Sequence, residues 1–191
     1  VRVRLFGRSL RTGPITDPGV LQSAEKVFSS EFPFTAPVKV ENVESDENGV
    51  RVLYRDNEDS GIEEEVFEQV LAATGRDPNL TELNLEQTSL KLDSRGIPVY
   101  NPLTMQCGNS PVFIAGDVNN TLTVLHEAAD EGRIAGDNAG RFPDVREGRR
   151  SSPMTVVFTD PQMAVVGKTW KDLQGRDFVM GSVSFEGQGR S

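Results

Sequence analysis

A glycine–aspartate pair at the end of an apolar run is the chemically most informative feature of this sequence. The run Pro111–Ala115 predicts a buried parallel strand, Gly116-Asp117 ends it, and a helix is expected over 122–140. A carboxylate at a strand's C-terminal tip can accept a hydrogen bond from a sugar or ribitol hydroxyl, and the helix directs unpaired N–H groups at the same place. The segment alone fits a cofactor site and an ordinary loop equally well.

A second glycine follows another apolar run earlier in the chain. Gln69–Ala73 predicts a short buried strand, and Thr74-Gly75-Arg76 leads out of it. Gly75 permits a close approach of the backbone or a turn with positive φ. Taken by itself, this segment is better explained as the exit from a strand into a loop.

The residues that could carry redox or proton-transfer chemistry are few. The chain has one cysteine, Cys107, which has no partner for disulfide exchange and is expected to be structural. It has one histidine, His126, for which a packed or backbone-contacting role is expected. From these two residues we therefore predict that the chain contains no redox-active dithiol and no acid–base pair.

The first half of the chain shows alternating helix and strand patterns. Asp17-Pro18 is a typical helix start, an N-cap followed by proline at the first helical position, and apolar residues recur behind it at helical spacing. The acidic stretch 56–65 favours a turn. The expected elements are a strand over 1–6, a helix that begins after Asp17, strands over 38–43, 49–54 and 69–73, a hairpin turn at 46–49, and the acidic turn.

The second half is expected to contain a helix with a stripe of small residues over 122–140, which would let it lie close on a sheet. Residues 141–152 are polar and are predicted to form a linker. Strands are expected over 155–158 and 164–166, followed by the start of a helix at Thr169.

Three motifs, taken in order, resemble the FAD- and NAD(P)-dependent disulfide reductase family, with dihydrolipoamide dehydrogenases the most similar members. The first is Ala73-Thr74-Gly75-Arg76 with Pro78-Asn79, followed by Thr104. The second joins 112–118 to the helix segment 125–132, and the third, 156–167, resembles the opening of the family's dimer-forming domain. Any one of these motifs is only moderately specific for the family, whereas three motifs in the family's order make a strong resemblance.

The resemblance implies an α/β fold made of partial Rossmann-like domains followed by the start of an α+β dimerisation domain. Residues 1–75 would be the C-terminal part of an NAD(P)-binding domain, and 76–148 the returning part of an FAD-binding domain. Residues 153–191 would begin the dimerisation domain. Both chain ends resemble cut strands, so we expect a fragment.

The resemblance also assigns the cofactor-binding residues, with FAD and NAD(P) as the cofactors. Asp117, with Gly116 leaving room beside it, would hold the FAD ribitol, and the backbone of Leu125 and His126 would face the flavin. Val40 would contact the adenosine. The pyridine-nucleotide site would be lined by Ala73, Thr74, Gly75 and Arg76.

One position departs from the pattern of NAD-preferring members, which carry an acidic residue at the tip of the strand that opens this chain. Here Gly7 occupies that position and Arg8 follows it. The ribose-binding carboxylate is therefore absent. Either the protein prefers NADP, with Arg8 near the 2′-phosphate, or it uses the nucleotide poorly.

Composition narrows the partners. The net charge of −9 argues against a nucleic-acid partner, and no apolar run is long enough for a membrane span. We therefore expect a cytoplasmic protein, and the family resemblance implies a homodimer that acts on a small-molecule or lipoyl-type disulfide. The alternatives left open are a flavin-dependent NAD(P)H oxidase or transhydrogenase of the same fold, and a non-catalytic dimerisation or interaction fragment.

Overall fold

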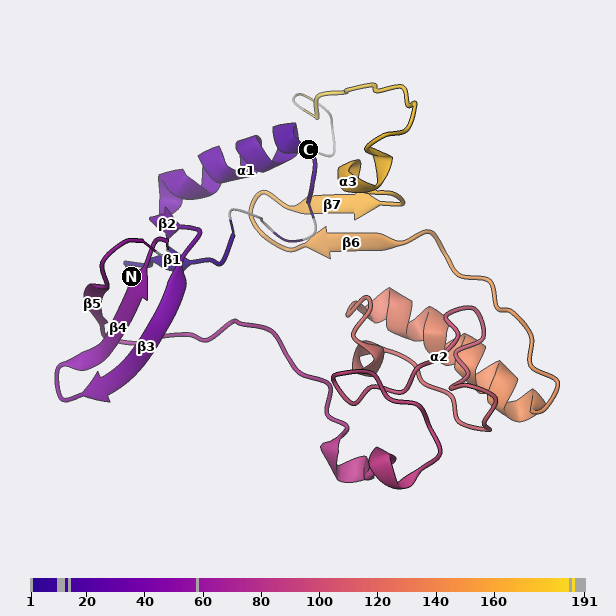
Figure 1. Ribbon diagram of the computed structural model, residues 1–191. Coiled ribbons are helices and arrows are strands. Elements are labelled where there is room, and N and C mark those ends of the chain that lie inside the picture. Colours follow the sequence, from indigo (N-terminus) through magenta and orange to yellow (C-terminus); the bar gives the residue numbers. More distant parts are fainter. Residues whose placement is uncertain (1, 10–12, 14, 58, 186, 188–191) are drawn as a thin grey trace. The chain divides into compact units, whose positions relative to one another are not determined.

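The computed structural model describes residues 2–9, 13, 15–57, 59–185 and 187 of the chain (Figure 1). The chain forms two compact units, each described here by itself. One unit comprises Val1–Gln69 together with Val156–Ser191, and the other comprises Val70–Thr155. The α/β character expected from the sequence is confirmed by these helices and strands, whereas the division into three partial domains stays a prediction.

The first unit opens with a β-α-β element. Strand β1 (Leu5–Phe6) pairs in parallel with β2 (Phe34–Thr35), and helix α1 (Pro18–Glu31) connects them. The expected helix start is confirmed, because the Asp17 carboxylate accepts a hydrogen bond of 2.9 Å from the Val20 N–H. Of the strand expected over 1–6, residues 2–4 form no strand, and Val1 lies outside the described residues. Prolines at 33 and 37 bracket β2, and a proline cannot donate to a ladder.

Three antiparallel strands follow: β3 (Lys39–Asp46), β4 (Gly49–Arg55) and β5 (Glu63–Phe67). The expected hairpin is confirmed. The acidic turn expected over 56–65 was predicted too long, because its last three residues belong to β5, which begins at Glu63. Glu63 and Glu64 have partners on β4: Glu63 accepts from the Tyr54 hydroxyl at 2.9 Å, and Glu64 pairs with Arg51. Glu65 pairs with Arg4, which precedes β1.

The two apolar runs expected as buried parallel strands form no strand. In Gln69–Ala73 the Leu71 side chain is 90% exposed. In Pro111–Ala115 only Phe113 makes an isolated antiparallel bridge, with Gln106. A buried parallel strand needs strands paired with its edges. Among the described residues, no strand pairs with either run.

The second unit contains helix α2 (Leu125–Arg141) and three short 3₁₀ turns, Thr81–Leu83, Leu85–Gln87 and Asp117–Asn119. The expected helix is confirmed but begins three residues later. The helix was expected to pack through its stripe of small residues, and this prediction was wrong. Gly132 and Gly136 have open space around them, and the buried face consists of Glu127, Glu131, Ile134 and Asn138.

In the polar segment 141–152, which was expected to be a linker, Arg141 ends α2, and the residues after it have no regular secondary structure but pack on α2. The Gly148 N–H donates to the Leu103 carbonyl at 2.8 Å. A Cβ at Gly148 would collide with the Ile134 side chain, so only glycine allows this approach. The Asn138 side chain also exchanges two hydrogen bonds of 2.8 Å with the Arg146 backbone.

The last elements are strands β6 (Met154–Val157) and β7 (Met163–Val166) and helix α3 (Trp170–Leu173). They confirm the expected strands and helix, and Thr169 caps α3 in a reciprocal pair with Asp172. Within the first unit, Met163 packs with Ile15, Ala24 and Phe28. In the described residues we find no helix whose length and apolar character would let it cross a membrane.

Candidate functional site

The second unit contains a hollow of about 810 Å³. It brings together two segments that the sequence analysis singled out, the one around Gly75 and the turn that begins at Asp117. Its lining residues are Ala72, Ala73, Gly75, Arg76, Asp77, Pro78, Asn79, Asp117, Val118, Asn120 and Thr123.

Asp117 presents a free carboxylate at this hollow. The residue is exposed, and its carboxylate has no hydrogen-bond partner among the residues that the structure describes. Gly116 beside it is buried with φ of 79°, which favours glycine. A Cβ at Gly116 would meet the Ala128 Cβ at 3.4 Å, so α2 lies close behind the turn.

A buried carboxylate on α2 holds this turn from behind. Glu131 is 0% exposed, and its Oε2 accepts hydrogen bonds from the Gly116 N–H at 2.7 Å and from Asn119 Nδ2 at 2.6 Å. Asn119 Oδ1 in turn accepts from the Thr121 N–H at 3.0 Å. The backbone on both sides of Asp117 is therefore anchored to one side chain.

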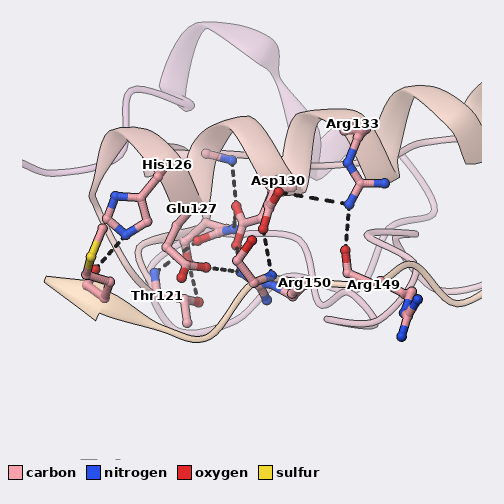
Figure 2. A network of polar contacts seen from close by, with 12 residues as sticks. Thr121, His126, Glu127, Asp130, Arg133, Arg149 and Arg150 are labelled. Carbon is pink, nitrogen blue, oxygen red and sulfur yellow. Dashed lines mark hydrogen bonds and ion pairs between the residues drawn. The ribbon is translucent and has the colours of Figure 1, made fainter. Parts of the chain in front are cut away.

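Arg150 compensates the charge of the Glu131 carboxylate and also pairs with Glu127 (Figure 2). Its Nη2 donates to Glu131 Oε1 at 2.7 Å and to Glu127 Oε2 at 2.9 Å. The Arg150 side chain is 22% exposed, whereas those of Glu127 and Glu131 are 4% and 1% exposed. Sequence reasoning missed this cluster. The i, i+4 spacing of two glutamates was a visible signal, but nothing local indicated Arg150 as their partner.

Residues 149–154, called the strap below, lie along α2 (Figure 2). Arg133 Nη2 donates to the Arg149 carbonyl at 2.5 Å. The Ser151 N–H donates to Asp130 Oδ2 at 2.8 Å, and this bond holds the pKa of Asp130 below its usual value. The strap is thus fixed to the helix by backbone contacts on both sides of Arg150.

The remaining predicted site residues do not line the hollow. His126 lies in the first turn of α2, where its Nε2 contacts the Met154 carbonyl at 2.6 Å, and Leu125 before it is 87% exposed. Thr74 lies between lining residues. Val40 is 45% exposed on β3, in the other unit.

Gly7 and Arg8 directly follow β1, as expected for the tip of that strand. The Gly7 N–H donates to the Thr35 carbonyl at 3.0 Å, which continues the pairing of β1 with β2. Arg8 is exposed. An exposed arginine at a strand tip can meet a phosphate.

Cys107 is buried in a cluster with Ile97 and Ile114, and it is 1% exposed. Burial raises the pKa of the Cys107 thiol above its ordinary value. A buried thiol with a raised pKa is a poor nucleophile. This environment suits a packing role for the only cysteine of the chain.

The residues of the hollow fit one end of a flavin nucleotide. The unpaired Asp117 carboxylate suits a hydroxyl-bearing chain, and Gly116 allows close approach to the backbone. Helix α2 begins nearby at Leu125, and its N-cap residue Val124 makes no side-chain cap, so the first N–H groups of the helix are available as donors. The donor and acceptor set therefore matches a polyol joined to an electron-accepting ring.

Comparison with known proteins defines the class. Residues 4–132 match the family described as pyridine nucleotide-disulphide oxidoreductase, and the chain belongs to this family. Members of this family use FAD and NAD(P).

The chain is similar to several individual proteins. The dihydrolipoyl dehydrogenase of Cupriavidus necator is 30% identical over 181 residues, which cover 92% of this chain and 37% of the relative. A mercuric reductase of Staphylococcus aureus is 30% identical over 87% of this chain and 30% of its own length. The chain thus spans about a third of the curated relatives it matches.

Solved structures support the fold. The crystal structure of LpdA from Mycobacterium tuberculosis superposes with a TM-score of 0.75 at 23% identity, over 91% of this chain and 36% of that chain. The flavoprotein disulfide reductase RclA from Escherichia coli gives a TM-score of 0.72 at 20% identity, over 89% and 38%.

Proposed function

We propose that the protein is an FAD- and NAD(P)-dependent oxidoreductase of the disulfide reductase type, similar to dihydrolipoyl dehydrogenases. It would pass electrons between NAD(P)(H) and a dithiol/disulfide substrate by way of FAD. The observation that carries the proposal is the unpaired Asp117 carboxylate, which faces the same hollow as the segment around Gly75. The family assignment over residues 4–132 supports it.

In this proposal each part of the second unit has a defined role. Asp117 accepts a hydrogen bond from the ribitol, Gly116 leaves room beside it, and the backbone of Leu125 and His126 donates toward the flavin ring. When bound, the flavin supplies the two-electron chemistry that links nucleotide and disulfide. The N-terminus of α2 stabilises negative charge close to it.

Ala73, Thr74, Gly75 and Arg76 would line the pyridine-nucleotide site, and Val40 would contact the adenosine. Gly7 and Arg8 favour a nucleotide with a 2′-phosphate, because the strand tip offers a cation in place of a carboxylate. A higher kcat/KM for NADH than for NADPH in the full-length protein would contradict this preference.

The dithiol chemistry requires groups beyond those described, because the single cysteine of the chain is buried. We propose that the full-length protein acts on a small-molecule or lipoyl-type disulfide in the cytoplasm and forms a homodimer. Exposed apolar side chains near β6 and β7 support a partner surface, with Phe158 at 84% and Val166 at 64% exposed. Sedimentation as a monomer would contradict the dimer.

The direct test is FAD binding. The full-length protein, stripped of nucleotide, should bind FAD with loss of flavin fluorescence and a red-shifted absorbance band. It should then oxidise NADPH or NADH in the presence of a disulfide. A folded protein that binds no FAD would refute the proposal.

A further inference from the structure

Arg150 does not line the hollow, but it bonds to Glu131, which in turn accepts hydrogen bonds from the turn that carries Asp117. We propose that Arg150 is a positioning residue for flavin binding: it orients Glu131, which fixes the Gly116–Asn119 turn and so the Asp117 carboxylate. This inference rests on the proposed function. Arg150 itself would not touch the cofactor.

The first step is the orientation of the Glu131 carboxylate. The two carboxylate oxygens have different partners, since Oε2 accepts from Gly116 and Asn119, and Oε1 accepts from Arg150. The side chain is 1% exposed, so water does not offer a substitute partner. Loss of the bond at Oε1 frees the carboxylate to rotate, which also weakens its bonds to the turn.

The second step is electrostatic. Glu127 and Glu131 are one helical turn apart on the buried face of α2, and Arg150 is the one cation paired with them in the described part of the chain. Without Arg150, two buried carboxylates would lie one turn of α2 apart with no cation between them. Their repulsion would favour conformations in which Glu131 moves away from Gly116.

The third step connects the turn to the site. Asp117 is exposed and its carboxylate has no partner in the described structure, so its location depends on the backbone around it. Two groups on either side of Asp117, the Gly116 N–H and the Asn119 amide, both donate hydrogen bonds to Glu131. A loosened turn lowers the population in which Asp117 is placed for the ribitol, and FAD affinity falls accordingly.

A double-mutant cycle separates positioning from general stability. FAD is titrated into nucleotide-free full-length protein carrying Arg150→Met, Asp117→Ala or both, and Kd is read from flavin fluorescence. Arg150→Met should raise Kd about three- to tenfold when Asp117 is present. It should raise Kd less than about twofold when Asp117 is already alanine, because the positioned group is gone. Equal effects in both backgrounds would overturn the inference.

Two further variants keep the test decisive if Arg150→Met is poorly folded. Arg150→Lys should retain Kd within about twofold, since a single nitrogen makes both contacts and an ammonium can replace it. Arg141→Met is the matched control: Arg141 lies on α2 and pairs with Asp137 but contacts neither the strap nor Glu131, so its loss should leave Kd unchanged. A Kd raised as much by Arg141→Met as by Arg150→Met would contradict the inference.

Amide hydrogen exchange supplies a readout that does not involve FAD. The Gly116 amide should exchange faster in nucleotide-free Arg150→Met than in the unaltered protein and in Arg150→Lys, and unchanged exchange would overturn the proposed path. If the unaltered protein binds no FAD, the proposed function fails together with the inference. If it binds FAD and the cycle is additive, only the inference fails.

Discussion

Substitution of Glu131 by glutamine should destabilise the protein more than the same change at Glu127, one helical turn away. Both side chains are buried, at 1% and 4% exposure, and both contact Arg150. They differ in what else they bind. Glu131 also accepts from Gly116 and Asn119, whereas the structure describes Arg150 as the sole hydrogen-bond partner of the Glu127 carboxylate.

The magnitude follows from those partners. In Glu131→Gln the amide oxygen can serve the turn, which places the amide NH₂ 2.7 Å from the Arg150 donor. One charge-assisted bond is lost, about 1.5–3 kcal/mol, with donor–donor repulsion in addition. In Glu127→Gln the amide oxygen can still accept from Arg150, so we expect a loss of about 0.5–1.5 kcal/mol.

Urea unfolding of the two variants and the unaltered protein at pH 7 measures the difference. The free energy of unfolding should fall by at least about 1 kcal/mol more for Glu131→Gln, with similar m-values. The reasoning would be refuted if the two variants lost equal stability, or if Glu127→Gln lost more. Either result would mean that the bonds from Glu131 to the turn contribute little.

Three further predictions concern the same unit. The pKa of Asp130 is lowered mainly by the hydrogen bond from the Ser151 N–H, so this contact stabilises the folded state at pH 7 and the stabilisation is lost as pH falls through the lowered pKa. The stability difference between unaltered protein and Asp130→Asn should therefore be full at pH 7 and shrink as pH falls below about 4, and a constant difference would contradict this. Cys107, buried with a raised pKa, should react with a thiol reagent at pH 8 only after unfolding, so rapid labelling of folded protein would contradict its burial. Gly148→Ala should cost about 1–3 kcal/mol in urea unfolding because its Cβ would collide with Ile134, whereas Gly136→Ala, which has open space, should not destabilise.

Features set by neighbours in sequence were predictable. Asp17 and Thr169 cap their helices through contacts three residues away, and the hairpin between β3 and β4 follows from its turn residues. These elements depend on local hydrogen bonds, which a single sequence displays directly. Gly116-Asp117 was expected to end a strand, and in the structure Asp117 begins a 3₁₀ turn instead.

Features set by distant residues were not predictable. The runs 69–73 and 111–115 are apolar, but burial as parallel strands depends on neighbouring strands that the described residues do not provide. The cluster behind Asp117 joins Arg150 to Glu131, 19 positions away. Small residues at helical spacing drew attention to one face of α2, whereas the buried face has a glutamate pair satisfied by that distant arginine.

The central claim is that Asp117 holds the flavin, and the flavin-to-protein ratio of two variants tests it most directly. A carboxylate–hydroxyl bond is worth about 1.5–3 kcal/mol, so Asp117→Ala in the full-length protein should weaken FAD binding about ten- to a hundredfold. Asp117→Asn should weaken it less, because its carbonyl can still accept. The thermal midpoint of both nucleotide-free variants should stay close to that of the unaltered protein, since the structure describes no partner for this carboxylate. Unaltered FAD content per folded molecule in Asp117→Ala would contradict the account.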